Sequence, residues 1–153
     1  MKAYSIYHSP IGEIAITADP DAILSLGFAP PEADAVLADP PLLRQAHKWL
    51  DAYFSGERPD PNALPIRLVG TPFQLAVWEM LSQIPYGQTV TYGQLARRLS
   101  PTMSAQAVGQ AVGRNPISIV IPCHRVLGAH GRLTGYAGGL NRKRALLQIE
   151  GVL

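Results

Sequence analysis

One short segment carries the residue types of a nucleophilic site. In "IVIPCHRV", residues 119–126, the only cysteine of the chain, Cys123, is followed directly by His124 and Arg125. A cation beside a cysteine lowers the pKa of the thiol from ~8.5 towards the physiological range, and a histidine can take up the thiol proton. Cysteine is also commonly buried as a small hydrophobic residue. The segment therefore predicts either an inert core cysteine or a thiolate nucleophile.

A histidine that acts as a base usually needs an orienting partner on its other nitrogen. From residue 80 to the C-terminus the only carboxylate is Glu150, in "LLQIEGVL". If the partner of His124 comes from the same half of the chain, it is Glu150. Neighbouring side chains of an extended chain point to opposite faces, so we expect His124 to reach the thiol through a water molecule.

The surrounding sequence predicts the elements that hold this segment. The apolar run before Pro122 reads as a strand that ends at the cysteine. "TPFQ" from residue 71 and "TYGQ" from residue 91 are capping boxes, which predict that helices begin at these points. Ser104 is expected to cap a third helix, "AQAVGQAVG". The second and third of these helices have the proportions of a helix-turn-helix.

The third helix carries little side-chain bulk. Alanine and glycine dominate it, and Gln106 and Gln110 are its only long polar residues. Such a helix either packs closely on a neighbouring helix or approaches a DNA groove. Side chains that read base edges are usually Arg, Asn or Gln. Because this helix offers only its two glutamines, we expect it to bind DNA with little sequence specificity.

The first 70 residues predict a structural domain without catalytic residues. Their apolar stretches, broken by turn signals, indicate an antiparallel meander, and residues 42–53 have helical spacing. We therefore expect two domains: an N-terminal α/β support domain, 1–70, and a C-terminal domain, 71–153, that contains the helix-turn-helix and the cysteine segment. The predicted fold class is α+β, with a small antiparallel sheet domain followed by a mainly helical one.

The charge differs between the two halves. Residues 1–70 have a net charge of −4 and residues 71–153 of +6. The basic half is either a solvated surface or the face that meets a polyanion. The cationic candidates for phosphate contacts are Arg97, Arg98, Arg114, Arg125, Arg132, Arg142, Lys143 and Arg144.

Composition excludes several classes of protein. One cysteine allows no internal disulfide and no cysteine-rich zinc site, and the four histidines lack paired metal-ligand spacing. No apolar run approaches the ~20 residues that span a bilayer, and no signal peptide is evident. We expect a cytoplasmic protein without metal, cofactor or membrane contact.

Three motifs together resemble a known family. "NPISIVIPCHRV", "GYAGG" and "LLQIEG" closely resemble the O6-alkylguanine-DNA alkyltransferases, direct-reversal DNA repair proteins. The match covers essentially all of residues 71–153, and "SPIGEIAI" and "LDAYFSGE" resemble the less specific N-terminal domain. The resemblance implies a ribonuclease H-like first domain and a winged-helix-like second domain.

The resemblance also implies the reaction. Duplex DNA carrying O6-alkylguanine would be the partner, with O4-alkylthymine as a second candidate substrate. The base is flipped out of the helix, and its alkyl group passes irreversibly to the cysteine, once per protein molecule. The protein would be monomeric in the absence of DNA.

Residue roles follow from the matching positions. Cys123 would accept the alkyl group, His124 would be the water-mediated base, and Glu150 would orient it. Asn115 resembles the hinge asparagine, and Tyr92 the tyrosine that assists base extrusion and gives a proton to guanine N3. Further residues would contact guanine or DNA. The guanine pocket would include Tyr136, Ala137, Gly138 and the carbonyls of Cys123 and Val126, and the DNA contacts would include Ala105, Gln106, Arg114 and Arg125.

Two positions depart from the family pattern. Gln106 stands where the family has an arginine that enters the base stack. Ala137 stands where some members have a serine near guanine O6. The first departure bears on base flipping and the second on stabilisation of the leaving group.

Other functions fit the sequence less well. A non-catalytic alkyltransferase-like protein, which binds lesions and signals for other repair, would lack Cys123. A cysteine hydrolase would not explain the helix-turn-helix, and a thiol-based transcriptional sensor usually needs a second, resolving cysteine.

Overall fold

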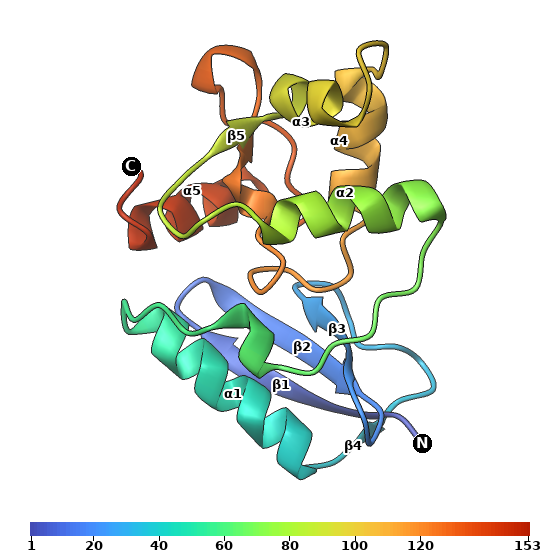
Figure 1. Ribbon diagram of the computed structural model, residues 1–153. Helices are drawn as coiled ribbons and strands as arrows, with labels where there is room; N and C mark the ends of the chain where they lie inside the picture. The colour runs from blue at the N-terminus through green and yellow to red at the C-terminus, as the bar shows by residue number, and fades with distance from the viewer. The chain divides into compact units, whose positions relative to one another are not determined.

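The N-terminal residues fold as a small sheet with one helix against it. The computed structural model describes residues 1–153 and divides into two units, Met1–Leu68 and Val69–Leu153. The strands of the first unit follow the sheet order β3-β2-β1-β4. They are β1 (Ala3–Ser9), β2 (Gly12–Ala18), β3 (Ile23–Gly27) and β4 (Val36–Leu37) (Figure 1). The first three form the predicted antiparallel meander, whereas β4 pairs parallel to β1, which the sequence did not indicate.

Helix α1 (Pro41–Phe54) closes the core of this unit. Its apolar residues recur at helical spacing, and it contacts β1 and β2. The buried ones are Leu43, Ala46, Trp49, Leu50 and Tyr53. The indole Nε1 of Trp49 donates a hydrogen bond to the carbonyl of Asp60, at 2.9 Å, beside the 3₁₀ turn η1 (Pro61–Ala63).

The second unit is mainly helical. Its helices are α2 (Pro72–Ser82), α3 (Tyr92–Leu99), α4 (Ala105–Gly113) and α5 (Leu140–Ile149). Both capping boxes form, since Thr71 and Thr91 each accept the N–H of the glutamine three residues later at 3.1 Å. Ser104 caps α4 by accepting the N–H of Ala107 at 3.0 Å. The three predicted helix starts are confirmed.

Helices α2, α3 and α4 pack together as the helix-turn-helix requires. Helix α4 contacts both α2 and α3, and the indole of Trp78 donates to the carbonyl of Ala111 at 2.9 Å. The predicted α+β class, with a sheet domain followed by a helical domain that contains a helix-turn-helix, is confirmed. None of the helices has the length and apolar character needed to cross a bilayer.

Two short strands join the cysteine segment to the start of α3. β5 (Val90–Thr91) pairs parallel with β6 (Val126–Leu127), in the register Val90 to Val126. The 3₁₀ turn η2 (Cys123–Arg125) immediately precedes β6, and Tyr92 immediately follows β5. A second 3₁₀ turn, η3 (Ala129–Gly131), follows in the loop towards α5.

The predicted strand before Cys123 is wrong. Residues 119–121 form turns, in which Val120 N–H donates to Ser118 C=O at 2.8 Å and Ile121 N–H to Ile117 C=O at 3.1 Å. Ile119 has a φ of 70°, which is rare for a β-branched residue and is incompatible with a strand. Cys123 itself begins a turn of 3₁₀ helix rather than ending an extended chain.

Candidate active site

Cys123 lies beneath the surface of the second unit, with 6% of the residue exposed. Its N–H donates to Ile121 C=O at 2.8 Å, which fixes the approach to the 3₁₀ turn. Burial raises the pKa of the thiol, because it disfavours the thiolate. A hydrogen bond from the side chain of Asn115 and the positive charge of Lys143 act in the opposite direction on this pKa. Stabilisation of the thiolate therefore depends on these neighbouring groups rather than on solvent.

Asn115 holds the turn that presents the cysteine. Its Nδ2 donates to the carbonyl of Ile121 at 2.8 Å, and its Oδ1 accepts the N–H of Ile117 at 3.0 Å. One amide thus satisfies backbone groups on both sides of Ile119, where a strand partner would otherwise be needed. The asparagine named from the resemblance is the residue that ties the two ends of this turn together.

His124 and Glu150 form a buried pair. The imidazole Nε2 lies 2.6 Å from Oε2 of Glu150, and neither side chain is exposed. A carboxylate beside Arg125 is ionised and can only accept, so Nε2 carries the proton and Nδ1 keeps its lone pair. Nδ1 is buried and has no hydrogen-bond partner. Burial lowers the pKa of His124, so the ring is held neutral with one nitrogen able to accept a proton.

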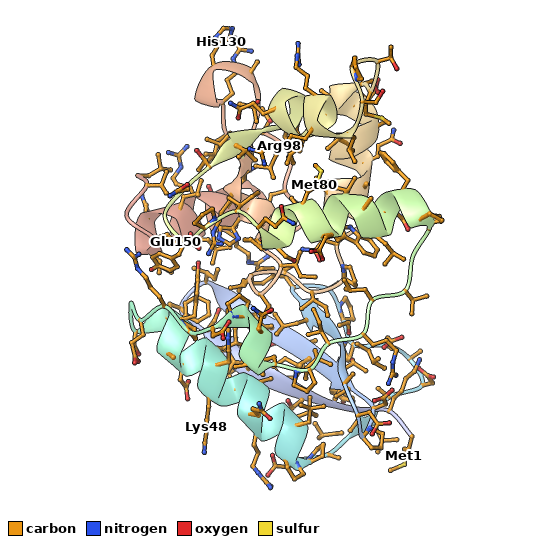
Figure 2. All side chains as sticks on the ribbon, viewed as in Figure 1. Met1, Lys48, Met80, Arg98, His130 and Glu150 are labelled. Atoms are coloured by element: carbon orange, nitrogen blue, oxygen red, sulfur yellow. The ribbon has the colours of Figure 1, made fainter.

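Arg125 turns away from solvent towards the same carboxylate. Its Nε and Nη2 donate to the two oxygens of Glu150 at 2.7 and 3.1 Å, and its Nη1 donates to Ile84 C=O at 2.7 Å. Arg125, which was predicted to contact DNA, has its guanidinium buried in this internal ion pair. Figure 2 labels Glu150, the acceptor of these bonds, at the end of α5.

Tyr92 and Tyr136 bring two hydroxyl groups towards the cysteine segment. Tyr92 begins α3, and its hydroxyl donates to Gly135 C=O at 3.0 Å. Tyr136 has a buried hydroxyl without a hydrogen-bond partner. Burial raises the pKa of both phenols, and the negative charge of a Cys123 thiolate raises them further. Both hydroxyls are thus protonated donors near neutral pH.

A groove of about 990 Å³ lies over the helix-turn-helix. Its walls come from α3, α4 and the loop of residues 128–137, whose outward tip Figure 2 marks with His130. Small residues of α4 open the groove, and they share its wall with both glutamines of that helix. The α4 lining residues are Ala105, Gln106, Gly109, Gln110 and Gly113. Tyr92, Tyr136 and Ala137 also line the groove, which brings the predicted guanine-contacting and DNA-contacting residues to one surface.

Three further predicted residues, Gly138, Arg114 and Val126, are not among those that line this groove. Gly138 accepts a hydrogen bond from Arg142 at 3.1 Å. Arg114 is exposed just after α4. The carbonyl of Val126, expected to accept from guanine, already accepts from Lys143. No group of three or more histidine, cysteine, aspartate or glutamate side chains gathers to hold a metal ion.

Comparisons with known proteins identify the family of this chain. The family model for the 6-O-methylguanine DNA methyltransferase DNA-binding domain matches residues 72–152, and the model for the ribonuclease-like domain of the same family matches residues 2–68. The chain belongs to the O6-methylguanine DNA methyltransferase family.

Individual members of the family match over nearly their whole length. A methylated-DNA–protein-cysteine methyltransferase of Methanosarcina acetivorans is 41% identical, with 97% of each chain covered. Its counterpart in Haemophilus influenzae is 41% identical over 96% of this chain and 85% of its own. The crystal structure of Mycobacterium tuberculosis OGT in complex with DNA has a TM-score of 0.87 and 42% identity, covering 97% of this chain and 92% of that one.

Sequence reasoning missed one residue that this methyltransferase fold brings to the site. Lys143, expected to contact phosphate, is fully buried, and its ammonium lies against the loop that walls the groove. The burial of this lysine could have been predicted from the spacing of residues along α5. Lys143, Leu146, Leu147 and Glu150 stand at positions i, i+3, i+4 and i+7, which is one helical face, and all four are buried. That periodicity predicts a buried lysine.

Proposed function

We propose that this protein repairs alkylated DNA by transferring the alkyl group of O6-alkylguanine to the sulfur of Cys123. The observation that carries the proposal is the buried pair of His124 and Glu150 beside the only cysteine, in the unit whose helix-turn-helix bears the groove. Family membership over both units supports it. The relatives named above are, by their names, transferases that act between methylated DNA and a protein cysteine.

The reaction balances with the residues present. The thiolate of Cys123 forms a bond to the alkyl carbon as the bond from that carbon to guanine O6 breaks. His124 receives the thiol proton at Nδ1 through a water molecule, and Glu150 stabilises the resulting imidazolium. Tyr92 gives a proton to guanine N3, which makes guanine a better leaving group, and the resulting phenolate regains a proton from solvent. The product is a thioether that no group in this site can cleave, so each molecule acts once.

Positioning is divided among the other predicted residues. Asn115 holds the cysteine turn, and guanine, flipped out of the duplex, lies against Tyr136, Ala137 and the loop through Gly138. The carbonyls of Cys123 and Val126 accept from its exocyclic amine, and the Val126 oxygen can do so while it accepts from Lys143, because a carbonyl oxygen has two lone pairs. Ala105, Gln106 and Arg114 contact the DNA.

The two domains have different roles in this proposal. Residues 71–153 bind DNA and accept the alkyl group, while residues 1–70 support them. The protein acts as a monomer before it meets DNA, and we place it in the cytoplasm.

Intact mass spectrometry tests the proposal. After incubation with duplex DNA carrying O6-methylguanine, the protein should gain the mass of one methylene group, because a methyl replaces the thiol hydrogen, and peptide mapping should locate it on Cys123. Cys123→Ser should gain nothing and still bind the same duplex. Retained DNA binding without any adduct on the wild-type protein would overturn alkyl transfer and leave a lesion-binding protein.

A further inference from the structure

Arg97 carries the only permanent positive charge among the residues that line the groove. The other basic residue there is His130, which is charged only when it is protonated, and no carboxylate lines the groove. The second unit has only two side-chain carboxylates, and Arg97 is ion-paired with neither: Glu150 is bound to His124 and Arg125, and Glu79 is exposed on α2. The charge of Arg97 is therefore not neutralised within the protein.

The guanidinium of Arg97 lies over the first turn of α3. Its Nη1 donates to Gly93 C=O at 3.2 Å, and a Cβ atom at position 93 would lie only 3.4 Å from this nitrogen. Tyr92, the preceding residue, has its ring close to α4, since a Cβ atom at Gly109 would lie 3.7 Å from Cδ1 of this ring. The charge is thus held against the residue next to Tyr92, at the wall of the groove.

The neighbouring Arg98 does not share this position. Both arginines are exposed in the last turn of α3, but Arg98, which is labelled in Figure 2, is not among the residues that line the groove. The long polar side chains that α4 contributes to the groove, Gln106 and Gln110, are neutral. Arg97 and Arg98 are therefore a matched pair of charges, one inside the groove and one outside it.

The place of a charge determines which state of the DNA it stabilises. Extruding a base turns its nucleotide by about 180° around the backbone and moves it into the protein. A cation that attracts the duplex equally before and after extrusion strengthens binding but cannot shift the equilibrium between the two states. A cation that contacts the nucleotide only after extrusion favours the extruded state.

We propose that Arg97 is a positioning residue for base extrusion: its guanidinium binds the phosphate of the nucleotide that has left the duplex and holds this nucleotide in the groove. This inference rests on the proposed function, in which guanine is flipped out. A guanidinium can bind phosphate through two parallel N–H donors, and the hydrogen bond to Gly93 uses only one of the five donors of Arg97. Arg97 thus supplies from α3 a positive charge that Gln106 does not supply from α4.

Single-turnover rates of alkyl transfer test the step at which Arg97 acts. At protein concentrations that saturate the duplex, Arg97→Gln should slow transfer from O6-methylguanine in duplex DNA by about tenfold or more, because a charge-assisted hydrogen bond is lost. Its reaction with free O6-benzylguanine, which needs no extrusion, should be nearly unchanged. An unchanged rate on the duplex, or equal slowing on both substrates, would overturn the proposal.

Two further variants separate the position of the charge from its presence. Arg98→Gln removes the same charge from the adjacent, exposed residue and should leave both rates nearly unchanged. Arg97→Lys keeps the charge without the planar fork and should recover part of the rate on the duplex. Equal slowing by Arg97→Gln and Arg98→Gln would overturn the proposal, as would a rate for Arg97→Lys no higher than that for Arg97→Gln.

Fluorescence of 2-aminopurine reports extrusion without alkyl transfer. This base brightens when it loses stacking, so beside O6-methylguanine in a saturated duplex it should brighten when Cys123→Ser protein binds. It should brighten less when the same protein also carries Arg97→Gln, and as much when it carries Arg98→Gln. Because this signal needs no transfer, it tests the inference even if Cys123 accepts no alkyl group. Absence of brightening in all three proteins would overturn the inference, whereas the mass of the wild-type protein would still decide the proposed function.

Discussion

The carboxylate of Glu150 organises the charged groups behind Cys123. Its oxygens accept from the ring of His124, twice from Arg125, and from the N–H of Gly87 at 3.1 Å. Only 5% of the residue is exposed. Removing one partner of a buried ion pair costs about 3–5 kcal/mol, because the other charge is left unpaired. Glu150 therefore affects both the stability of this unit and the tautomer of His124.

Replacing Glu150 with glutamine tests both effects. The amide oxygen can accept from His124 or from Arg125 but not fully from both, so we expect a lower melting temperature and a loss of tenfold or more in transfer rate. The rate defect should shrink as pH rises, because the thiol then ionises without help from the imidazole. Rates from pH 6 to 10 on O6-methylguanine duplex check this, with the exposed Glu79→Gln as the matched control. A rate defect independent of pH would mean that Glu150 serves the structure alone.

The chemical roles of the site residues were easier to predict from the sequence than the residues that they contact. The single cysteine, the base and the last carboxylate are evident from types and spacing in the sequence, and the structure brings His124 and Glu150 within hydrogen-bond distance. The sequence analysis also expected, on physical grounds, a cation near the thiol. We predicted that Arg125 would be this cation, because only neighbours along the chain are known to be close before the structure is seen. Folding pairs that arginine with Glu150 and brings Lys143 from 20 positions away.

At the scale of elements, α4 lines the groove with small residues and two glutamines. Gln106 is exposed there, at the position where the family pattern has an arginine. A side chain that fills the gap left by a flipped base offsets part of an unstacking cost of a few kcal/mol. Arginine stacks on bases and carries charge, whereas glutamine is neutral and stacks poorly. Base flipping is therefore the step at which this protein should differ from relatives that keep the arginine.

Substituting arginine at position 106 tests this difference. Gln106→Arg should speed repair of O6-methylguanine in duplex DNA several-fold and leave the reaction with free O6-benzylguanine nearly unchanged, because the free base needs no flipping. Single-turnover rates on both substrates provide the measurement. Gln110→Arg adds the same charge to the same helix and serves as the control. Equal acceleration by the two variants would assign the gain to general attraction for DNA.

The elements themselves were predicted unevenly. Helix starts at Thr71, Thr91 and Ser104 are encoded by local side-chain caps, which act within three residues and can be recognised in the sequence. The segment before Cys123 is different. Its apolar residues suggested a strand, but Asn115 and the positive φ of Ile119 produce a turn whose apolar side chains are buried without a partner strand. Alternation and propensity cannot distinguish those two outcomes for three apolar residues.

At the scale of the whole molecule, charge is divided between the two units. The basic excess lies in the second half, and after folding its exposed arginines are those that can meet phosphate. They are Arg97, Arg98, Arg114, Arg132 and Arg144, whereas Arg125 and Lys143 are buried. The basic surface available to a polyanion is therefore smaller than the number of basic residues in the sequence suggests. The affinity of this surface for a polyanion should depend on ionic strength.

Salt titration of DNA binding tests this surface. For duplex DNA the logarithm of the binding constant falls with the logarithm of salt concentration at a slope of about −0.9 per neutralised phosphate. Arg114→Ala removes an exposed charge just after α4, so we expect a slope shallower by about 1 and a similar loss of affinity for duplexes of different sequence. Lys48→Ala removes a charge from the acidic first unit and should leave the slope unchanged, as fluorescence anisotropy over a range of salt concentrations will show. Equal changes in the two variants would mean that net charge, rather than the face around α4, governs binding. A flat response in the wild type would mean that the basic half is only a solvated surface.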